Sequence, residues 1–385
     1  MKLNIEEIKN SVEQNKIKAI SIDTSIFDQK QRGLEWGLLK RIRQFKDTSV
    51  VFLLPEIVKR ELESHLLKDA IESETSLNKT LKLMSTPWCI TPETRENIIK
   101  LATGHVDAQS IVKSRLDVFL KETGAVHIET ADHVSMPELL ERYFRQQPPF
   151  SQKEGKKYEF PDALALLSLE RWAAINESLV LVISDDPDWQ SYCDESERLI
   201  GLNDLAEGFG CFQEQEASYI CKELAKSIVE GDPHKLNQAV EGAVRAKEDS
   251  TEVSIEADSQ FRYEEEGAET QFKEIQIRSI SDLPYLEPVE YDGETLVASL
   301  MVDVSAEITA YFSFDKWDGI DREYFSMGSG QASSTVNLSI EVLVTFSGEL
   351  YKAPVVEDIE VGSIDAAVSF YDLEPDWMSD PTNFD

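Results

Sequence analysis

The chain has 385 residues, of which 41% are hydrophobic, so it is long enough for two domains and apolar enough to form real cores. Its formal net charge is -35, and the excess of acid is uneven: residues 1–230 hold 29 basic and 39 acidic side chains, whereas residues 231–385 hold 9 and 34. A chain this acidic gains little from counterion release on nucleic acid, which counts against an autonomous nucleic-acid binder.

The sequence carries no sign of export or membrane insertion. No apolar run approaches the roughly 18 residues of a membrane span, and residues 1–18 mix Glu with Lys and have no apolar signal core. The four cysteines show no C-x-x-C spacing, so we expect buried free thiols rather than a zinc site. A cytoplasmic location is therefore expected.

The first part of the chain alternates strand-like and helix-like segments. Short apolar runs at 18–23, 49–54 and 179–184 predict buried strands, and 124–129 and 198–202 predict weaker ones. Such alternation predicts an α/β domain with a parallel sheet flanked by helices. We place this domain at residues 1–230, with a helical insertion at about 67–125. Further helices are expected at 34–45, 56–67, 137–145 and 161–175.

The C-terminal part follows a different pattern. Between 300 and 315 the even positions are apolar and the odd positions mostly polar, and the stretch 336–346 repeats this alternation. A period of two is typical of half-buried antiparallel strands. Shorter runs at 253–257 and 275–277 add to them. We predict a linker or helix at 231–250 and an acidic β-rich domain, resembling a small sandwich or barrel, at 251–385.

Carboxylates follow the predicted strands of the first domain. Asp23 ends the first strand, Glu61 lies on the helix after the second, Asp162 sits in the first turn of a helix opened by Pro161, and Asp186 follows the strand at 179–184. In a parallel α/β sheet, ligands bind beyond the carboxyl ends of the strands. Each acid alone has an ordinary alternative as a helix-dipole or turn residue.

Together the acids are harder to explain without a cation. Like charges gathered at one sheet edge repel each other unless a positive ion neutralises them. Hard oxygen ligands suit Mg²⁺ or Mn²⁺, and two such ions can activate water and stabilise the leaving oxygen in phosphodiester hydrolysis.

The order of these acids resembles that of the PIN-domain nucleases over about residues 15–210. The resemblance rests on the ordered set of motifs, because no single one is specific. The motifs are Ile22-Asp23-Thr24-Ser25, Pro55-Glu56-Ile57-Val58-Lys59-Arg60-Glu61-Leu62, Glu159-Phe160-Pro161-Asp162-Ala163-Leu164 and Ser184-Asp185-Asp186-Pro187-Asp188-Trp189.

The resemblance implies roles for particular residues. Asp23, Glu61, Asp162 and Asp186 are expected to be the catalytic, metal-binding acids, with Asp188 as a supporting ligand. Asp185 occupies the variable position and is a weaker candidate. The resemblance also implies that Ser25 and Ser184 orient the acids or the substrate.

Basic and aromatic residues precede Asp162 and could hold a single strand through phosphate contacts and base stacking. A solvated loop with a few lysines is an equally good interpretation of this segment. His65 lies four residues after Glu61 and shares its helix face, but a packing or surface histidine is the favoured interpretation. The residues expected to contact substrate here are Arg145, Lys153, Lys156 and Lys157.

The expected function is a Mg²⁺- or Mn²⁺-dependent nuclease, with single-stranded RNA preferred over DNA as the substrate. By resemblance to bacterial relatives, a toxin or an antiviral defence effector is a plausible setting, with control by a protein partner or by the acidic C-terminal domain. If that domain inhibits, its deletion should raise activity. The alternatives are a catalytically silent PIN fold that serves as a binding module in an assembly, and a DNA nuclease.

Overall fold

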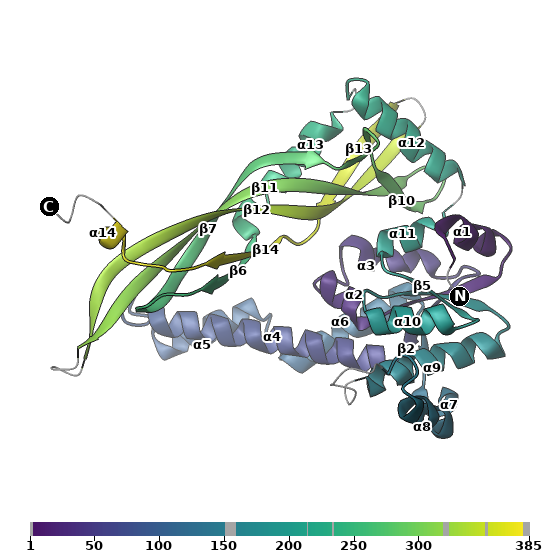
Figure 1. Ribbon diagram of the computed structural model, residues 1–385, viewed down its shortest axis with the longest axis horizontal. Helices are drawn as coiled ribbons and strands as arrows, with labels where there is room; N and C mark the ends of the chain where they lie inside the picture. Colours follow the sequence, from purple (N-terminus) through teal and green to yellow (C-terminus); the bar gives the residue numbers. More distant parts are fainter. Residues whose placement is uncertain are drawn as a thin grey trace. The chain divides into compact units, whose positions relative to one another are not determined.

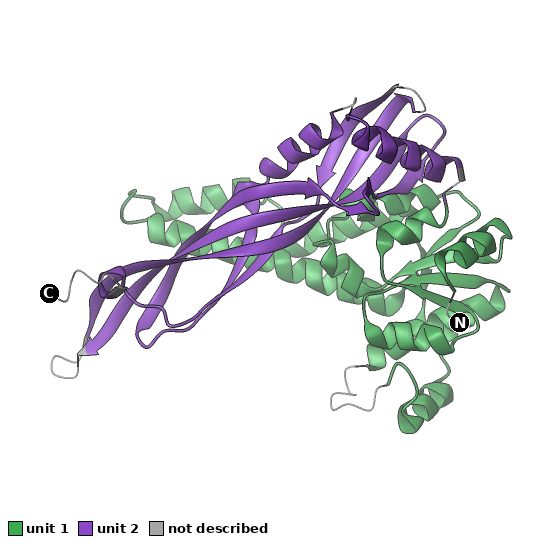
Figure 2. Ribbon diagram, turned by 45° about the horizontal axis from the view of Figure 1, so that its top comes forward, with its two compact units in different colours: residues 1–212 green, residues 213–385 purple. Residues whose placement is uncertain are grey.

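The computed structural model describes residues 3–150, 159–213, 215–232, 235–318, 323–350 and 353–379. The chain divides into two compact units, Met1–Phe212 and Gln213–Asp385 (Figure 2). The helix α12 (Gln215–Val229) thus groups with the second unit by its contacts. Whether independently folding domains end at the expected positions, 1–230 and 251–385, stays a prediction.

The first unit is built on a parallel five-stranded sheet of order β3-β2-β1-β4-β5. Strand β1 is buried at five of its six positions, and β4 at four of its five, as expected for strands covered on both faces. The predicted fold class, a parallel sheet flanked by helices, is confirmed (Figure 1). The strands are β1 (Ile17–Ile22), β2 (Val51–Pro55), β3 (Val126–Ile128), β4 (Leu179–Ile183) and β5 (Leu199–Leu202).

Helices connect these strands, and α9 is the most deeply packed of those that carry a candidate acid. Its buried positions include Ala163, Leu166, Leu167 and Leu169, so it is apolar around much of its circumference. The elements are α1 (Ile5–Glu13), α2 (Thr24–Gln29), α3 (Gly37–Arg41), η1 (Ile42–Phe45), α7 (Thr130–His133), α8 (Met136–Arg145), α9 (Phe160–Ile175), α10 (Pro187–Glu195) and α11 (Leu205–Gly210).

The predicted insertion after the second strand is helical. The helix that begins at Glu56 does not end near residue 67 but continues as α4 (Glu56–Met84), and it is followed by α5 (Pro92–Ala102) and α6 (Ala108–Thr123). No position of α5 is buried. Thr91 caps α5 and Asp107 caps α6, each accepting a hydrogen bond from a backbone N–H in the first turn.

The second unit holds an antiparallel sheet dominated by two long strands, β11 (Leu296–Asp318) and β12 (Glu323–Glu349). The antiparallel β-rich character predicted for this part is confirmed. The sheet runs β10-β11-β12-β13, with β7 paired along the rest of β11, and its described strands form an open rather than a closed path. The other strands are β7 (Arg262–Ile277), β8 (Ser279–Ile280), β9 (Leu283–Pro284), β10 (Leu286–Tyr291) and β13 (Ala353–Val361).

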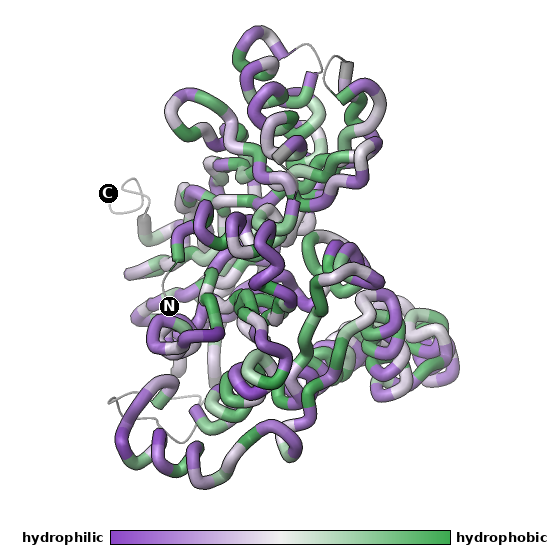
Figure 3. The backbone as a smooth tube through the Cα atoms, turned by 90° about the vertical axis from the view of Figure 1, so that its right-hand side faces the viewer, coloured by the Kyte–Doolittle hydropathy of each residue, from purple (hydrophilic) through white to green (hydrophobic). Residues whose placement is uncertain are grey.

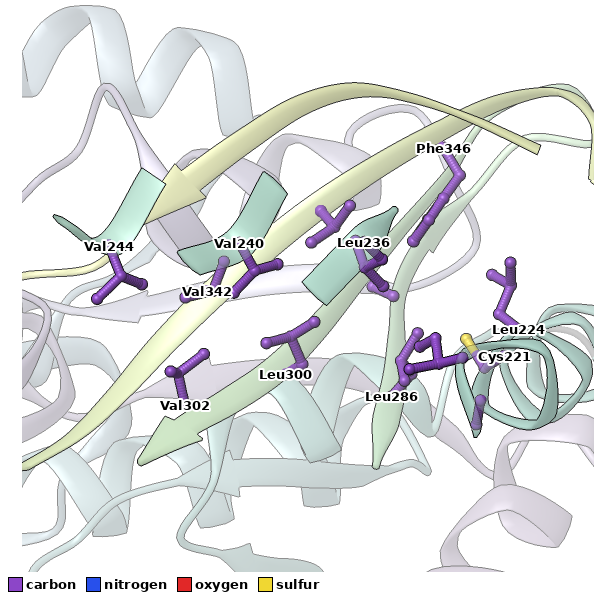
Figure 4. Packing of buried hydrophobic residues seen from close by; sticks show 14 of the residues in the cluster. Cys221, Leu224, Leu236, Val240, Val244, Leu286, Leu300, Val302, Val342 and Phe346 are labelled. Carbon is purple, nitrogen blue, oxygen red and sulfur yellow. The ribbon is translucent and has the colours of Figure 1, made fainter. Parts of the chain in front are cut away.

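One face of this sheet is buried along β11 from Leu296 to Phe314. Near the start of β11 it packs against α12 and α13 (Leu236–Arg245), as Figure 4 shows for Leu224, Leu236 and Val240. Farther along, the even positions from Ile308 to Phe314 pack against a two-stranded parallel sheet of β6 (Glu252–Ala257) and β14 (Asp365–Phe370). The remaining short elements are η3 (Glu248–Ser250) and α14 (Asp376–Ser379).

Hydrophobic and hydrophilic residues are interleaved along the described parts of the chain (Figure 3). Among the described helices, none is both long and apolar enough to cross a membrane. Cys193, Cys211 and Cys221 are buried free thiols, as expected, but Cys89 is exposed. The prediction of burial was wrong for Cys89, because it lies in the surface turn between α4 and α5.

Candidate metal-dependent active site

The candidate site lies where the strand order of the parallel sheet reverses, between β1 and β4. The backbone N–H of Asp23, directly after β1, donates to the carbonyl of Ile183 at the end of β4 (2.9 Å). From this point the chain continues from β1 to β2 on one side and from β4 to β5 on the other. Because the two connections diverge, a crevice opens at the carboxyl ends of β1 and β4. The residues that follow β1 and β4 are therefore brought together.

Asp23 is the most enclosed of the candidate acids, with only 4% of its surface exposed. One oxygen, Oδ1, accepts from the Thr24 N–H (2.6 Å), while Oδ2 accepts from the hydroxyls of Ser25 (2.5 Å) and Ser184 (2.9 Å). Burial raises the pKa of Asp23, and these hydrogen bonds oppose that rise because they stabilise the carboxylate. The two serines thus orient Asp23.

Ser184 also connects Asp23 to the acidic segment after β4. Its Oγ accepts from the N–H of Asp186 (3.0 Å), and Asp186 in turn caps α10 by accepting from the N–H of Asp188 (2.7 Å). Gln190 holds the backbone of this turn by donating to the carbonyl of Ser184 (2.6 Å). The turn between β4 and α10 is therefore fixed by side chains that also belong to the site.

Glu61 joins the group through the first turn of α2. The hydroxyl of Thr24 donates to Glu61 Oε2 over 2.7 Å. Because Thr24 also donates its backbone N–H to Asp23, one residue holds two of the candidate acids. Thr24 belongs to the motif around Asp23, but sequence reasoning gave it no role, since its contact with Glu61 spans 37 residues.

Asp162 supplies the electrostatic evidence that the acids form one group. Its Oδ1 accepts from the indole Nε1 of Trp189 (2.8 Å). Burial, followed by the negative charges of Asp23, Asp186 and Glu61, raises the pKa of Asp162 to about 7. Asp23, Asp186 and Glu61 thus lie close enough to Asp162 to repel its charge.

Trp189 is a site residue whose role sequence reasoning missed. It is buried, with 1% of its surface exposed, and a buried indole N–H needs an acceptor. The motif placed an aromatic residue after Asp188, but nothing in the sequence says that it reaches Asp162. Asp185, the weaker candidate for a metal-site acid, is exposed. Asp188 lies in the first turn of α10.

The residues present fit a divalent cation by their chemistry. They offer hard carboxylate oxygens, and a cation would offset the charges of Asp23, Asp186 and Glu61 that, after burial, raise the pKa of Asp162. Within the described ranges, no three His, Cys, Asp or Glu side chains are arranged as a ready metal shell. The acids that would hold the ion are Asp23, Glu61, Asp162 and Asp186, with Asp188 as a further donor.

Of the four basic residues expected to contact substrate, the structure describes Arg145. Arg145 ends α8 and forms an exposed ion pair with Glu141 (2.7 Å). Its neighbour Arg142 is a structural residue, stacked over Tyr192 and donating to the carbonyl of Pro148 (3.1 Å). Lys153, Lys156 and Lys157 lie outside the described residues.

Residues 20–189 match the family model described as PIN domain. This stretch contains the candidate acids Asp23, Glu61, Asp162, Asp186 and Asp188. No curated protein and no solved structure matches the chain. PIN domains have a nuclease-type fold, usually act on nucleic acid and usually use divalent metals.

Proposed function

We propose that this chain, whose residues 20–189 are a PIN domain, is a metal-dependent nuclease that cleaves phosphodiester bonds in single-stranded RNA. The observation that carries the proposal is the meeting of the PIN-motif acids at the ends of β1 and β4, where Thr24 connects Glu61 to Asp23 and Ser184 connects Asp23 to the segment of Asp186. Burial, followed by the charges of these three acids, raises the pKa of Asp162 beside them. Such mutual repulsion weakens the folded state unless the cluster serves to bind a cation.

Each residue of the site has a distinct task in this proposal. Asp23 and Asp186 are held by Ser184, so the two acids keep a fixed spacing across the β1–β4 junction. Glu61 is held against Asp23 by Thr24. Bound Mg²⁺ or Mn²⁺ supplies charge neutralisation and an acidified water for hydrolysis. No covalent enzyme intermediate is needed.

Asp162 has the role of a charged ligand in this proposal. Its pKa is about 7 in the metal-free site, and a bound cation would lower that pKa by offsetting the charges of Asp23, Asp186 and Glu61. The hydrogen bond from Trp189 fixes one of its oxygens and leaves the other for the cation.

A single-stranded substrate is favoured by an exposed aromatic residue beside a cation. Phe144 is 76% exposed on α8, next to Arg145, and α8 packs against α9, which carries Asp162. Exposed rings stack on unpaired bases, while arginine contacts the backbone. Arg145 and Phe144 therefore provide a binding surface for unpaired nucleotides, to which Lys153, Lys156 and Lys157 would add.

Direct comparison of polymers tests this preference. The full chain is incubated with labelled single-stranded RNA, single-stranded DNA and duplexes of the same sequence, with Mn²⁺ or Mg²⁺. The proposal expects single-stranded RNA to be cut fastest. Faster cutting of DNA would replace the ribonuclease by a DNA nuclease, while binding without cutting would favour a silent PIN fold that acts as a binding module.

The setting proposed is that of a toxin or antiviral defence effector controlled by a partner or by the acidic C-terminal part. The charge split supports it, because residues 231–385 carry 34 acidic and only 9 basic side chains. Growth of cells that express the full chain or its Asp162→Asn variant tests the toxic activity. Growth arrest by the wild type alone is expected when the controlling partner is lacking, and equal growth would contradict toxicity.

A further inference from the structure

Three side-chain hydrogen bonds at a constant sequence offset connect α2 and the turn after it with α4. Thr24 donates to Glu61 (2.7 Å), Asp28 pairs with His65 (2.9 Å) and Arg32 donates to Asp69 (2.6 Å). In each pair the partners are 37 residues apart, and the pairs follow one another at steps of four residues. We call this set of three pairs the α2–α4 ladder.

The ladder places His65 one helical turn from a proposed metal-site acid. Residues four apart on a helix lie on the same face, separated by about 6 Å along its axis. Glu61 and His65 therefore project from one face of α4, toward α2, which packs against it. Neighbouring phosphates of a single strand are separated by a similar distance.

The imidazole of His65 is oriented but not enclosed. Its Nδ1 lies 2.9 Å from Asp28 Oδ1, and 39% of the side chain remains exposed. A carboxylate that accepts from Nδ1–H fixes the ring, and Nε2 is a donor only when the ring carries both protons. Asp28 is itself held, because Arg32 donates to it over 2.7 Å.

The charged groups around this histidine are mainly acidic, with three carboxyl groups and one guanidinium. Asp28 and Arg32 approach from α2 and its following turn, while Glu61 and Asp69 lie on α4. Arg32 also bridges to Asp69. Because Arg32 is paired with Asp28 and Asp69, the imidazole of His65 is the nitrogen group of the ladder that remains to donate to an incoming anion.

We propose that His65 is a substrate-binding residue whose Nε2 donates a hydrogen bond to a phosphate next to the scissile one. An imidazolium between Asp28 and a phosphate donates from both ring nitrogens. Asp28 positions the ring, and the Arg32–Asp69 pair positions Asp28. This inference rests on the proposed nuclease function and assigns a phosphate-binding subsite to it.

Steady-state cleavage by the full chain tests the subsite. The variants are His65→Gln, Asp28→Asn and, as control, His105→Asn at an exposed turn whose left-handed backbone suits asparagine. Losing a hydrogen bond to a phosphate should raise the KM of His65→Gln about tenfold, with kcat within about twofold. Asp28→Asn should raise KM less, and His105→Asn should leave it unchanged.

A second measurement uses the wild-type chain with labelled histidines. Single-stranded oligonucleotide added with Ca²⁺ should shift the imidazole resonance that Asp28→Asn also perturbs, and no shift there would overturn the subsite even if His65→Gln does not fold. If the wild type cuts but His65→Gln loses only thermal stability or only kcat, the ladder is structural and the inference fails alone. If the wild type neither binds nor cuts nucleic acid, the inference falls together with the proposed function.

Discussion

The indole Nε1 of Trp189 donates a hydrogen bond to Oδ1 of Asp162 over 2.8 Å, joining α10 to the first turn of α9. The tryptophan is buried, and the carboxyl has a pKa raised to about 7 by burial and by neighbouring acids. The bond therefore stabilises the charged form of a carboxylate in surroundings that disfavour charge.

Trp189→Phe tests the role of this bond. The change keeps an aromatic ring but removes the donor, so the pKa of Asp162 should rise further and its oxygen should lose its fixed direction. We expect metal-dependent cleavage at neutral pH to fall by about tenfold to a hundredfold, for a hydrogen bond to a charged group of about 1.5–3 kcal/mol. Raising the pH should recover part of the loss. A variant as active as wild type at pH 7 would contradict this role.

The stability of the metal-free protein should depend on pH through Asp162. Its folded-state pKa of about 7 lies above the ordinary aspartate value of 3.8, so the folded protein holds a proton that the unfolded chain releases. The stabilisation is fully present below about pH 3.8 and is lost as the pH rises through about 7.

Urea unfolding in a metal chelator at a series of pH values measures this effect. The difference in unfolding free energy between wild type and Asp162→Asn should change between pH 4 and 7 and level off above that range. The variant is the matched control, because asparagine keeps an acceptor for Trp189 but cannot titrate. A difference independent of pH would show that Asp162 is not perturbed.

Divalent ions should stabilise the protein through Asp186 but not through its neighbour. Mn²⁺ at a hundred times its dissociation constant adds about 2.7 kcal/mol to the unfolding free energy of a protein that binds it only when folded. Thermal unfolding with and without Mn²⁺ should show this gain in wild type and in Asp185→Asn, whose side chain is exposed. Asp186→Asn should lose most of it. Equal stabilisation of both variants would place the ion elsewhere.

Ser184→Ala should impair catalysis more than folding. It removes the donor to Asp23 and the acceptor for the Asp186 N–H, so cleavage should fall by about tenfold to a hundredfold. Ser178→Ala is the matched control, since Ser178 is also buried but lies just before β4, at the opposite end of the strand. Comparable activity of the two variants in a cleavage assay would contradict a role for Ser184 in orienting the acids.

The sequence contains the information for the strands and for the edge at which the acids gather. Apolar runs mark β1, β2 and β4, because parallel strands are buried on both faces. Alternating positions mark β11 and β12, whose even residues form the buried face. The acids after β1 and β4 could be placed together, since the carboxyl ends of parallel strands share an edge.

Side-chain contacts between segments far apart in the sequence could not be predicted in the same way. The bonds Thr24–Glu61 and Trp189–Asp162 depend on how α2 and α10 are set against α4 and α9. The pairing of His65 with Asp28 depends on the same packing, so the histidine looked like an ordinary surface residue. The expected end of the helix near residue 67 was also wrong. No glycine or proline interrupts the sequence between Glu56 and Met84, so α4 continues to Met84.

The central claim is that the carboxylate cluster around Asp162 cuts nucleic acid with the help of a divalent ion. Its most direct test is cleavage of labelled single-stranded RNA and DNA by the purified full chain with Mn²⁺ or Mg²⁺. Wild type is compared with Asp162→Asn, Asp186→Asn and the control Asp185→Asn. We predict metal-dependent cutting by wild type and Asp185→Asn and its loss in the other two variants. Undiminished cutting by Asp162→Asn or Asp186→Asn, or no cutting by a folded wild type that binds the ion, would contradict the claim.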